Sequence, residues 1–384
     1  MRINPLLLVG SPLAALCLFS SVSGFRSRLS SKGIVPRPQE GLRSLQLGPL
    51  HLKERDVDGN VKPVVDGDAE QQEERSRELQ SILLLNGVAV LFGSQHAVIK
   101  STLDVFPSPS VVNLWRFLSS ALLFSPALVS AIHYQLRSLQ GESMKTTDES
   151  RGIWQAGAEL GLYTFLGFAF QAIGMETTSA SKSAFLLYLN VKFVPFLGFV
   201  LFQKHITTAT WVSALLAFTG TFFLSSDGTG IVEGDLWSIA AAAASAMFIL
   251  RLENFSQKFD AAQLNAINFS VVALLCSVWV TRDATLLGEG GAIVLEDIIG
   301  PLVNDPFPIV YLGVITTALC NYLQTLGQRD ISAEKAAIIY SMDPVYGAMF
   351  SYSLLGEKMG SKGLFGAGLI LLGVWLSARR PVEE

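Results

Sequence analysis

The chain has 384 residues, of which 50% are hydrophobic and only 16% are charged, and its formal net charge is −4. An ordinary soluble domain carries about 25% charged residues, whereas the mean hydropathy here is +0.43. Between residues 81 and 378 the apolar residues form runs of bilayer length, which takes about 20 residues. This pattern excludes a water-soluble enzyme with one core, and it excludes disorder over most of the chain.

The first 24 residues have the order of a secretory signal peptide. Arg2 precedes an apolar stretch, and Val22-Ser23-Gly24 offers modest or small residues at a cleavage site. The alternative is a short N-terminal membrane anchor.

Residues 25–55 hold seven basic residues against two glutamates, with serines among them. This composition is typical of transit peptides. A signal peptide followed by such a segment, opening on Phe25, resembles the bipartite presequence of algae with secondary plastids. The alternative is a disordered basic tail on a protein of the secretory pathway. Residues 56–80 then turn acidic and predict a solvated linker.

The remainder predicts an all-α membrane protein with ten transmembrane helices, because lipid offers no partner to open backbone groups. The predicted spans are Ser81–Ile99, Val111–Ile132, Gln155–Gly174, Ala180–Phe202, Thr208–Ser225, Asp235–Asn254, Gln263–Val280, Pro308–Leu326, Ala333–Leu355 and Lys362–Ser377.

A shift of 152 residues realigns much of the chain without a gap, which predicts two repeats at residues 81–226 and 234–380. The pairs in this register include Leu160 with Leu312, Thr164 with Thr316, Tyr188 with Tyr340, Val191 with Asp343 and Lys192 with Pro344. Five spans per repeat is an odd number, so we expect two inverted five-helix repeats. The distribution of Lys and Arg predicts that both ends of the bundle lie on one side of the membrane.

Several motifs of the second half resemble the drug/metabolite transporter superfamily, in particular its EamA-like ten-helix members. They are Ser332–Ala337, Tyr340–Pro344, Leu354–Lys358 and the glycine-rich stretch Gly363–Gly373. Leu250–Glu253 resembles plant plastid-type members, whereas Gln203-Lys204-His205 departs from the Gly-Glu pair expected in the first half. The resemblance implies a binding cavity between the halves and proton- or exchange-coupled movement of small metabolites.

Lys192 and Asp343 are the sharpest candidate site residues, because a charge within a membrane span is costly and marks function by default. Tyr188 shares a helical face with Lys192, and Tyr340 shares one with Asp343. We expect Lys192 and Asp343 to approach each other where the repeats meet and to line the cavity. The alternatives are a pair that only joins the halves, or no contact.

The other candidates are polar residues inside predicted spans. His96 is a candidate carrier of a coupling proton, and the bland alternative is a packed, hydrogen-bonded histidine. Each of the others has a structural alternative, such as interfacial placement, helix packing or capping. These candidates are Gln95, Arg116, Glu159, Asn321 and Gln324.

The sequence therefore predicts a secondary transporter of small organic metabolites that works by alternating access, rather than an enzyme. The partners expected are a metabolite, the lipid bilayer and a proton as candidate coupling ion, with no nucleic acid, metal or cofactor. A plastid sugar-phosphate antiporter is the second hypothesis, and a non-transporting membrane scaffold is the third. The predicted location is a plastid membrane. The sequence leaves the substrate and the oligomeric state open.

Overall fold

The computed structural model describes residues 54–55, 61–62, 67–106, 108–139, 144–203, 232–286 and 295–378, with scattered positions between 212 and 223. The predicted signal peptide and almost all of the transit-peptide segment lie outside these residues. So does most of the predicted span Thr208–Ser225. The chain divides into two compact units, Met1–Leu79 and Gln80–Glu384.

The first described helix starts earlier than predicted. In the N-terminal unit, the two-residue strands β1 (Glu54–Arg55) and β2 (Val61–Lys62) pair antiparallel. Helix α2 then runs over Gly67–Leu103, so the second half of the predicted acidic linker is helical. The reason is composition: Glu, Gln and Arg favour helices, and acidic residues are stabilising near a helix N-terminus.

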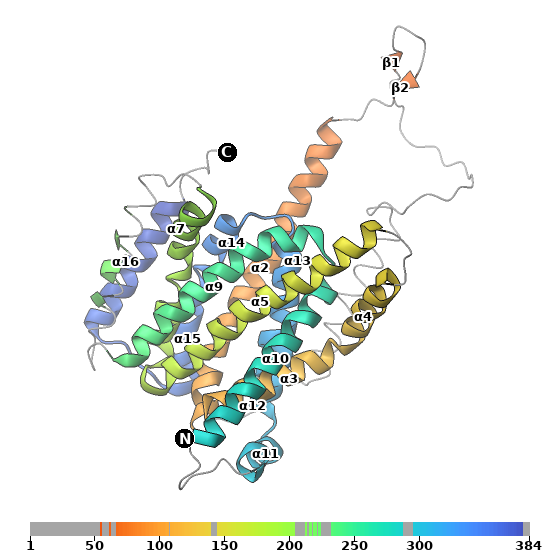
Figure 1. The fold of residues 1–384 in the computed structure, drawn as a ribbon. Coiled ribbons are helices and arrows are strands. Elements are labelled where there is room, and N and C mark those ends of the chain that lie inside the picture. The colour runs from red at the N-terminus through yellow and green to blue at the C-terminus, as the bar shows by residue number, and fades with distance from the viewer. Residues whose placement is uncertain are drawn as a thin grey trace. The chain divides into compact units, whose positions relative to one another are not determined.

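Within the described part of the second unit, the ordered elements are helices (Figure 1). They are α3 (Pro109–Leu123), α4 (Ser125–Leu139), α5 (Met144–Thr177), α6 (Ala180–Leu187), α7 (Asn190–Phe202), α9 (Glu233–Lys258), α10 (Ala261–Leu286), α11 (Leu295–Asn304), α12 (Phe307–Val310), the π-helix η2 (Tyr311–Leu319), α13 (Cys320–Gly327), α14 (Ala333–Tyr340), α15 (Asp343–Leu355) and α16 (Ser361–Ala378). Helix α5 packs between α9 and α10, and α10 also packs on α3.

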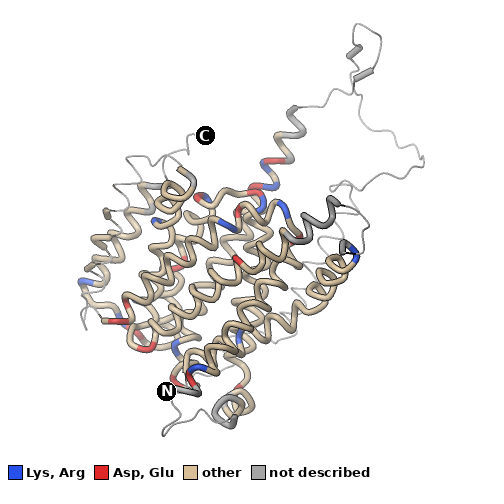
Figure 2. Tube along the Cα trace, in the orientation of Figure 1, with Lys and Arg blue, Asp and Glu red and all other residues tan. Residues whose placement is uncertain are grey.

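By length and apolar character, five helical segments among the described residues are able to cross a membrane. They are Glu74–Leu103, Ala180–Leu201, Glu233–Lys258, Ala261–Asp283 and Phe307–Gly327. A bent pair, α3 with α4, makes a sixth if it is one span. The predicted number of ten spans is therefore not confirmed. Charged residues gather mainly toward the helix ends (Figure 2), which fits a membrane protein.

Three predicted single spans are broken in the structure. The span predicted over Val111–Ile132 bends by 64° between α3 and α4, where Pro126 has no backbone N–H to continue the helix. The predicted spans Ala180–Phe202 and Ala333–Leu355 each divide into two short helices. Pro344 accounts for the second of these breaks by the same rule.

The broken helices correct the predicted register between the repeats. Each bound of α14 and α15 lies 153 residues after the corresponding bound of α6 and α7. The turn bonds agree, since Leu189 N donates to Leu186 O and Met342 N donates to Ile339 O. Gln203 and Gly356 then both end their helices with positive φ. The gapless pairing at 152 residues is therefore wrong in this segment.

The π-helix explains the change of register. Helices α3 and α10 begin 152 residues apart, whereas the elements after η2 are 153 apart. A π-helical stretch accommodates an extra residue within a continuous helix. The corrected register pairs Leu187 with Tyr340 and Asn190 with Asp343.

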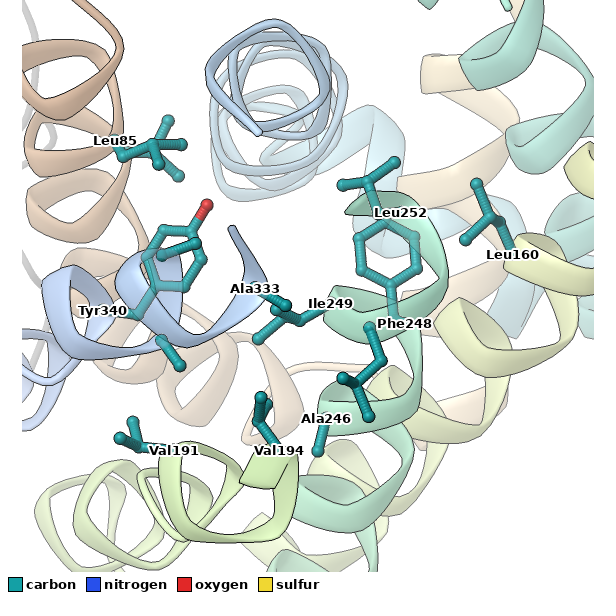
Figure 3. Packing of buried hydrophobic residues seen from close by; sticks show 14 of the residues in the cluster. Leu85, Leu160, Val191, Val194, Ala246, Phe248, Ile249, Leu252, Ala333 and Tyr340 are labelled. Carbon is teal, nitrogen blue, oxygen red and sulfur yellow. The ribbon is translucent and has the colours of Figure 1, made fainter. Parts of the chain in front are cut away.

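The two broken helices run antiparallel to each other. The N-terminus of α6 contacts Glu357, just beyond the end of α15, while Ala184 lies against Gly347 in the middle of α15. This is the arrangement that inverted repeats require. A buried apolar cluster joins both halves, and Figure 3 shows Leu85 and Leu160 together with Leu252 and Tyr340 among its members.

We predict that Gly347→Ala destabilises the protein by about 1–3 kcal/mol, the usual effect of overpacking. The added Cβ would lie 2.7 Å from the Cβ of Ala184, a rigid atom on the neighbouring helix. Gly368→Ala is the matched control, because a Cβ at Gly368 meets nothing within 4 Å. Thermal unfolding of the detergent-solubilised protein compares them, and equal midpoints for the two variants would contradict the close crossing.

Candidate functional site

A cavity of about 80 Å³ with a mixed polar and apolar lining lies within the second unit, and residues of both halves line it. This volume holds several water molecules, since one needs roughly 10–15 Å³. The lining residues are Phe92 and Gln95 of α2, Tyr163, Thr164, Gly167, Phe168 and Gln171 of α5, Leu187 of α6, Asn190 of α7, Ser245, Phe248 and Ile249 of α9, Asn321 and Gln324 of α13, Tyr340 of α14 and Asp343 of α15.

Several lining side chains have a buried polar atom without a hydrogen-bond partner. These atoms are Thr164 Oγ1, Asn190 Oδ1 and Asp343 Oδ1. An unsatisfied buried polar group costs about 1–3 kcal/mol, so a native protein rarely gathers them without a reason. Their concentration around one cavity indicates that water or a ligand occupies it.

His96 joins the two repeats at this cavity. Its Nε2 lies 3.7 Å from Asp343 Oδ1, and its Nδ1 lies 3.3 Å from Gln171 Nε2. An amide nitrogen only donates, so Nδ1 accepts and the neutral imidazole carries its proton on Nε2, facing the carboxylate. The His96 side chain is fully buried.

Arg116 is fully buried. It does not line the cavity itself but contacts residues that do. Its guanidinium donates to Gln95 Oε1 at 2.6 Å and to Thr317 Oγ1 at 2.5 Å. The cation also lies 4.2 Å from the ring centroid of Phe168, a distance at which cation–π attraction is significant. Arg116 therefore fixes Gln95 and Phe168, two lining residues, against the π-helix.

The structure thus brings half of the predicted site residues to the cavity lining, namely Gln95, Asn321, Gln324, Tyr340 and Asp343. His96 and Arg116 contact lining residues from behind, as described.

The remaining three predicted residues have other surroundings. Lys192 Nζ donates to Gly373 O at 3.4 Å, whereas Asp343 pairs with His96. Lys192 and Asp343 were predicted to contact each other, and in the structure they contact different residues. Tyr188 is buried in the apolar cluster. Glu159 forms a bidentate pair with Arg251, which ties α5 to α9.

Sequence reasoning missed Gln171 and Asn190, and a one-residue gap would have found them. At 153 residues Gln171 aligns with Gln324, and Asn190 aligns with Asp343. All four of these residues line the cavity. Thr164 carries the same signal, because it aligns with Thr317 at 153 residues, whereas Ser245 aligns with Phe92 and carries none.

Charge-assisted contacts join the repeats at one end of the bundle. The Glu357 carboxylate accepts from Ala180 N at 3.0 Å, from Ser181 N at 2.9 Å and from Ser181 Oγ at 2.8 Å. It therefore caps the N-terminus of α6, where backbone N–H groups have no helical partner. Nearby, Lys182 Nζ lies 2.8 Å from Asp235 Oδ2, and both side chains are buried.

The fold and the cavity define a class of protein: a multi-pass membrane protein built from two helical repeats that enclose this cavity. The EamA-like transporter family matches residues 79–226 and 232–379. The chain therefore belongs to the EamA-like transporter family.

Similar proteins are known from archaea and bacteria. An uncharacterized transporter of Archaeoglobus fulgidus is 25% identical over 304 residues, which are 79% of this chain and 87% of that protein. The uncharacterized transporter YyaM of Bacillus subtilis is 21% identical and covers 78% of this chain and 93% of its own length. A protein crystal structure shares the fold with a TM-score of 0.52 at 16% identity, covering 78% and 96% of the two chains.

We predict that Glu357→Ala lowers the free energy of unfolding by about 1.5–3 kcal/mol, the range for hydrogen bonds to a charged group. Glu357→Gln keeps an acceptor oxygen for α6 and should lose less. Glu233→Gln serves as control, because Glu233 is exposed and bonds only within α9 among the contacts described. Thermal unfolding of the purified protein measures the effect, and an alanine variant as stable as the control would refute the cap.

Proposed function

We propose that this protein is a secondary transporter that moves a small organic metabolite by alternating access between its two repeats. One observation carries the proposal: a cavity that contains unsatisfied polar atoms and is lined by both repeats lies within an apolar helical bundle. Polar groups inside a membrane mark substrate or ion pathways. Inverted repeats place such a site where the halves meet and allow them to rock around it.

We further propose that the coupling ion is a proton that binds at His96. The charged group in contact with His96 is Asp343 of α15, Gln171 of α5 faces its other nitrogen, and Gly347 lies near its ring. Protonation at Nδ1 creates a cation beside the carboxylate and requires the Gln171 amide to turn its oxygen toward the ring. The protonation state of His96 therefore changes contacts between α2, α5 and α15, which belong to different repeats.

A metabolite extract supplied to proteoliposomes tests both proposals. We expect mass spectrometry to detect uptake of at least one compound, stimulated by a pH gradient. His96→Gln and Asp343→Asn should reduce the stimulation about tenfold or more, while Glu233→Gln, an exposed acid, should leave it unchanged.

Each contrary outcome has its own meaning. Absence of any uptake, with folded protein confirmed by its unfolding curve, would favour the non-transporting scaffold. Uptake that ignores the pH gradient in the wild type would remove proton coupling and leave the transporter. Full gradient dependence in both variants would remove His96 and Asp343 as the proton site.

The sugar-phosphate alternative receives little support from the cavity. Phosphate dianions are recognised by Arg forks or Lys cations, and no Lys or Arg belongs to the lining. The one formally charged lining residue, Asp343, would repel a phosphate.

For location, we propose a plastid membrane reached by the bipartite presequence, on the strength of residues 1–55 alone. A fluorescent fusion of the full chain should accumulate in plastids, and removal of residues 25–55 should retain it in the endoplasmic reticulum. Retention of the full-length fusion in the endoplasmic reticulum would contradict this address.

A further inference from the structure

Two acceptor residues occupy equivalent positions in the two repeats. Asn190 is the first residue of α7, and Asp343 is the first residue of α15, 153 residues later. Both line the same cavity. We call Asn190 and Asp343 the acceptor pair. Because the two broken helices run antiparallel, the pair approaches the cavity from opposite repeats.

Each member of the acceptor pair has an oxygen that accepts no hydrogen bond, and Asp343 Oδ1 lies 3.7 Å from His96 Nε2. Asn190 Oδ1 and Asp343 Oδ1 are both buried and accept no hydrogen bond in the structure. A ligand that satisfies them must donate, and a group with several N–H bonds can donate to more than one oxygen. The ammonium group, with three donors and one positive charge, has this chemistry.

The charge of the lining also favours a cation. Asp343 is the one acidic residue of the lining, and no basic residue belongs to it. Nearby cations are engaged elsewhere: Arg116 bonds Gln95 and Thr317, and Lys192 donates to Gly373 O. The negative charge at the cavity is therefore available to a ligand whenever His96 is neutral.

The rest of the lining fits the body of an organic amine. Aromatic side chains make up much of the wall, and aromatic faces attract cations within about 6 Å. The ring of Phe168 is already in contact with the Arg116 guanidinium, which leaves the other aromatic rings for a ligand. Amide groups complete the wall and can bind polar substituents. The aromatic residues are Phe92, Tyr163, Phe168, Phe248 and Tyr340.

We infer that the acceptor pair binds the ammonium group of an organic amine with an aromatic or apolar body. The inference rests on the proposed function and names the class of its substrate. Because the two positions are related by pseudo-symmetry, we expect a carboxylate at position 190 to bind the ammonium group as a carboxylate at position 343 does.

A binding experiment on detergent-purified protein tests this pair directly. The probe is tyramine, compared with its neutral analogue tyrosol and its anionic analogue 4-hydroxyphenylacetate, and thermal stabilisation measures the affinity. We expect tyramine to bind at least tenfold more tightly than either analogue, the ratio for a hydrogen bond to a charged group of about 1.5 kcal/mol. Asp343→Asn should remove this preference.

The swapped double variant Asn190→Asp with Asp343→Asn separates binding from folding. It keeps one carboxylate and one amide, and we expect it to restore at least part of the preference for tyramine lost in Asp343→Asn. Gln263→Glu adds a carboxylate at the start of α10, outside the cavity lining, and paired with Asp343→Asn it should restore none. A cooperative thermal unfolding transition, measured without ligand, confirms that each variant is folded.

The outcomes distinguish this inference from the proposed function. Equal affinity for all three compounds in the wild type, or an unchanged preference in Asp343→Asn, would overturn the ammonium site even if metabolite uptake is observed. Failure of the swapped variant while the wild type prefers tyramine would overturn the role of Asn190. Tyramine preference without uptake of any compound would uphold the site and refute transport.

Discussion

The architecture depends on one constraint: within a membrane, backbone that leaves the helical pattern must find partners in protein or in a water-filled cavity. Among the breaks in this chain, two occupy equivalent positions in the repeats, between α6 and α7 and between α14 and α15. Each break tightens into a turn and is followed at once by a polar residue, Asn190 or Asp343. Residues on both sides of each break, Leu187 and Asn190 in one repeat and Tyr340 and Asp343 in the other, line the cavity, so the breaks and the candidate site lie together in the fold.

The backbones of the two repeats follow similar courses, but the side chains at equivalent positions differ. At one end of the bundle Glu357 caps α6 across the repeat boundary. The position 153 residues earlier is Lys204, a cation that cannot accept hydrogen bonds from a helix N-terminus. Both helices also have a serine cap of their own: Ser179 Oγ accepts from Lys182 N at 3.2 Å in α6, and Ser332 Oγ accepts from Lys335 N at 3.4 Å in α14. The Glu357 end therefore has additional charge-assisted contacts, and under the proposed alternating access the two ends would differ in the free energy needed to open them.

The sequence predicted the helical class, the duplication and most of the polar residues near the cavity, because buried polar groups in apolar spans are conspicuous. It did not predict the breaks between α3 and α4, between α6 and α7 or between α14 and α15, since hydropathy reports apolar length and not the path of the backbone. The predicted contact of Lys192 with Asp343 followed from a gapless register between the repeats. The π-helix at Tyr311–Leu319 accommodates one extra residue in the second repeat, which the gapless register ignored. Asn190 and Gln171 remained hidden for that reason. His96 was chosen for its chemistry, and its partner Asp343 required the three-dimensional crossing of α2 and α15.

The most direct test of the account is side-specific labelling of the cavity. In a variant without Cys17, Cys276 and Cys320, Ser245→Cys places one thiol on the cavity lining, on α9. A membrane-impermeant maleimide is added to one side or the other of oriented vesicles. Alternating access predicts that the thiol reacts from both sides, and that a transported compound slows both reactions. Labelling from one side only, under every ligand condition, would contradict a cavity that opens alternately to the two sides of the membrane.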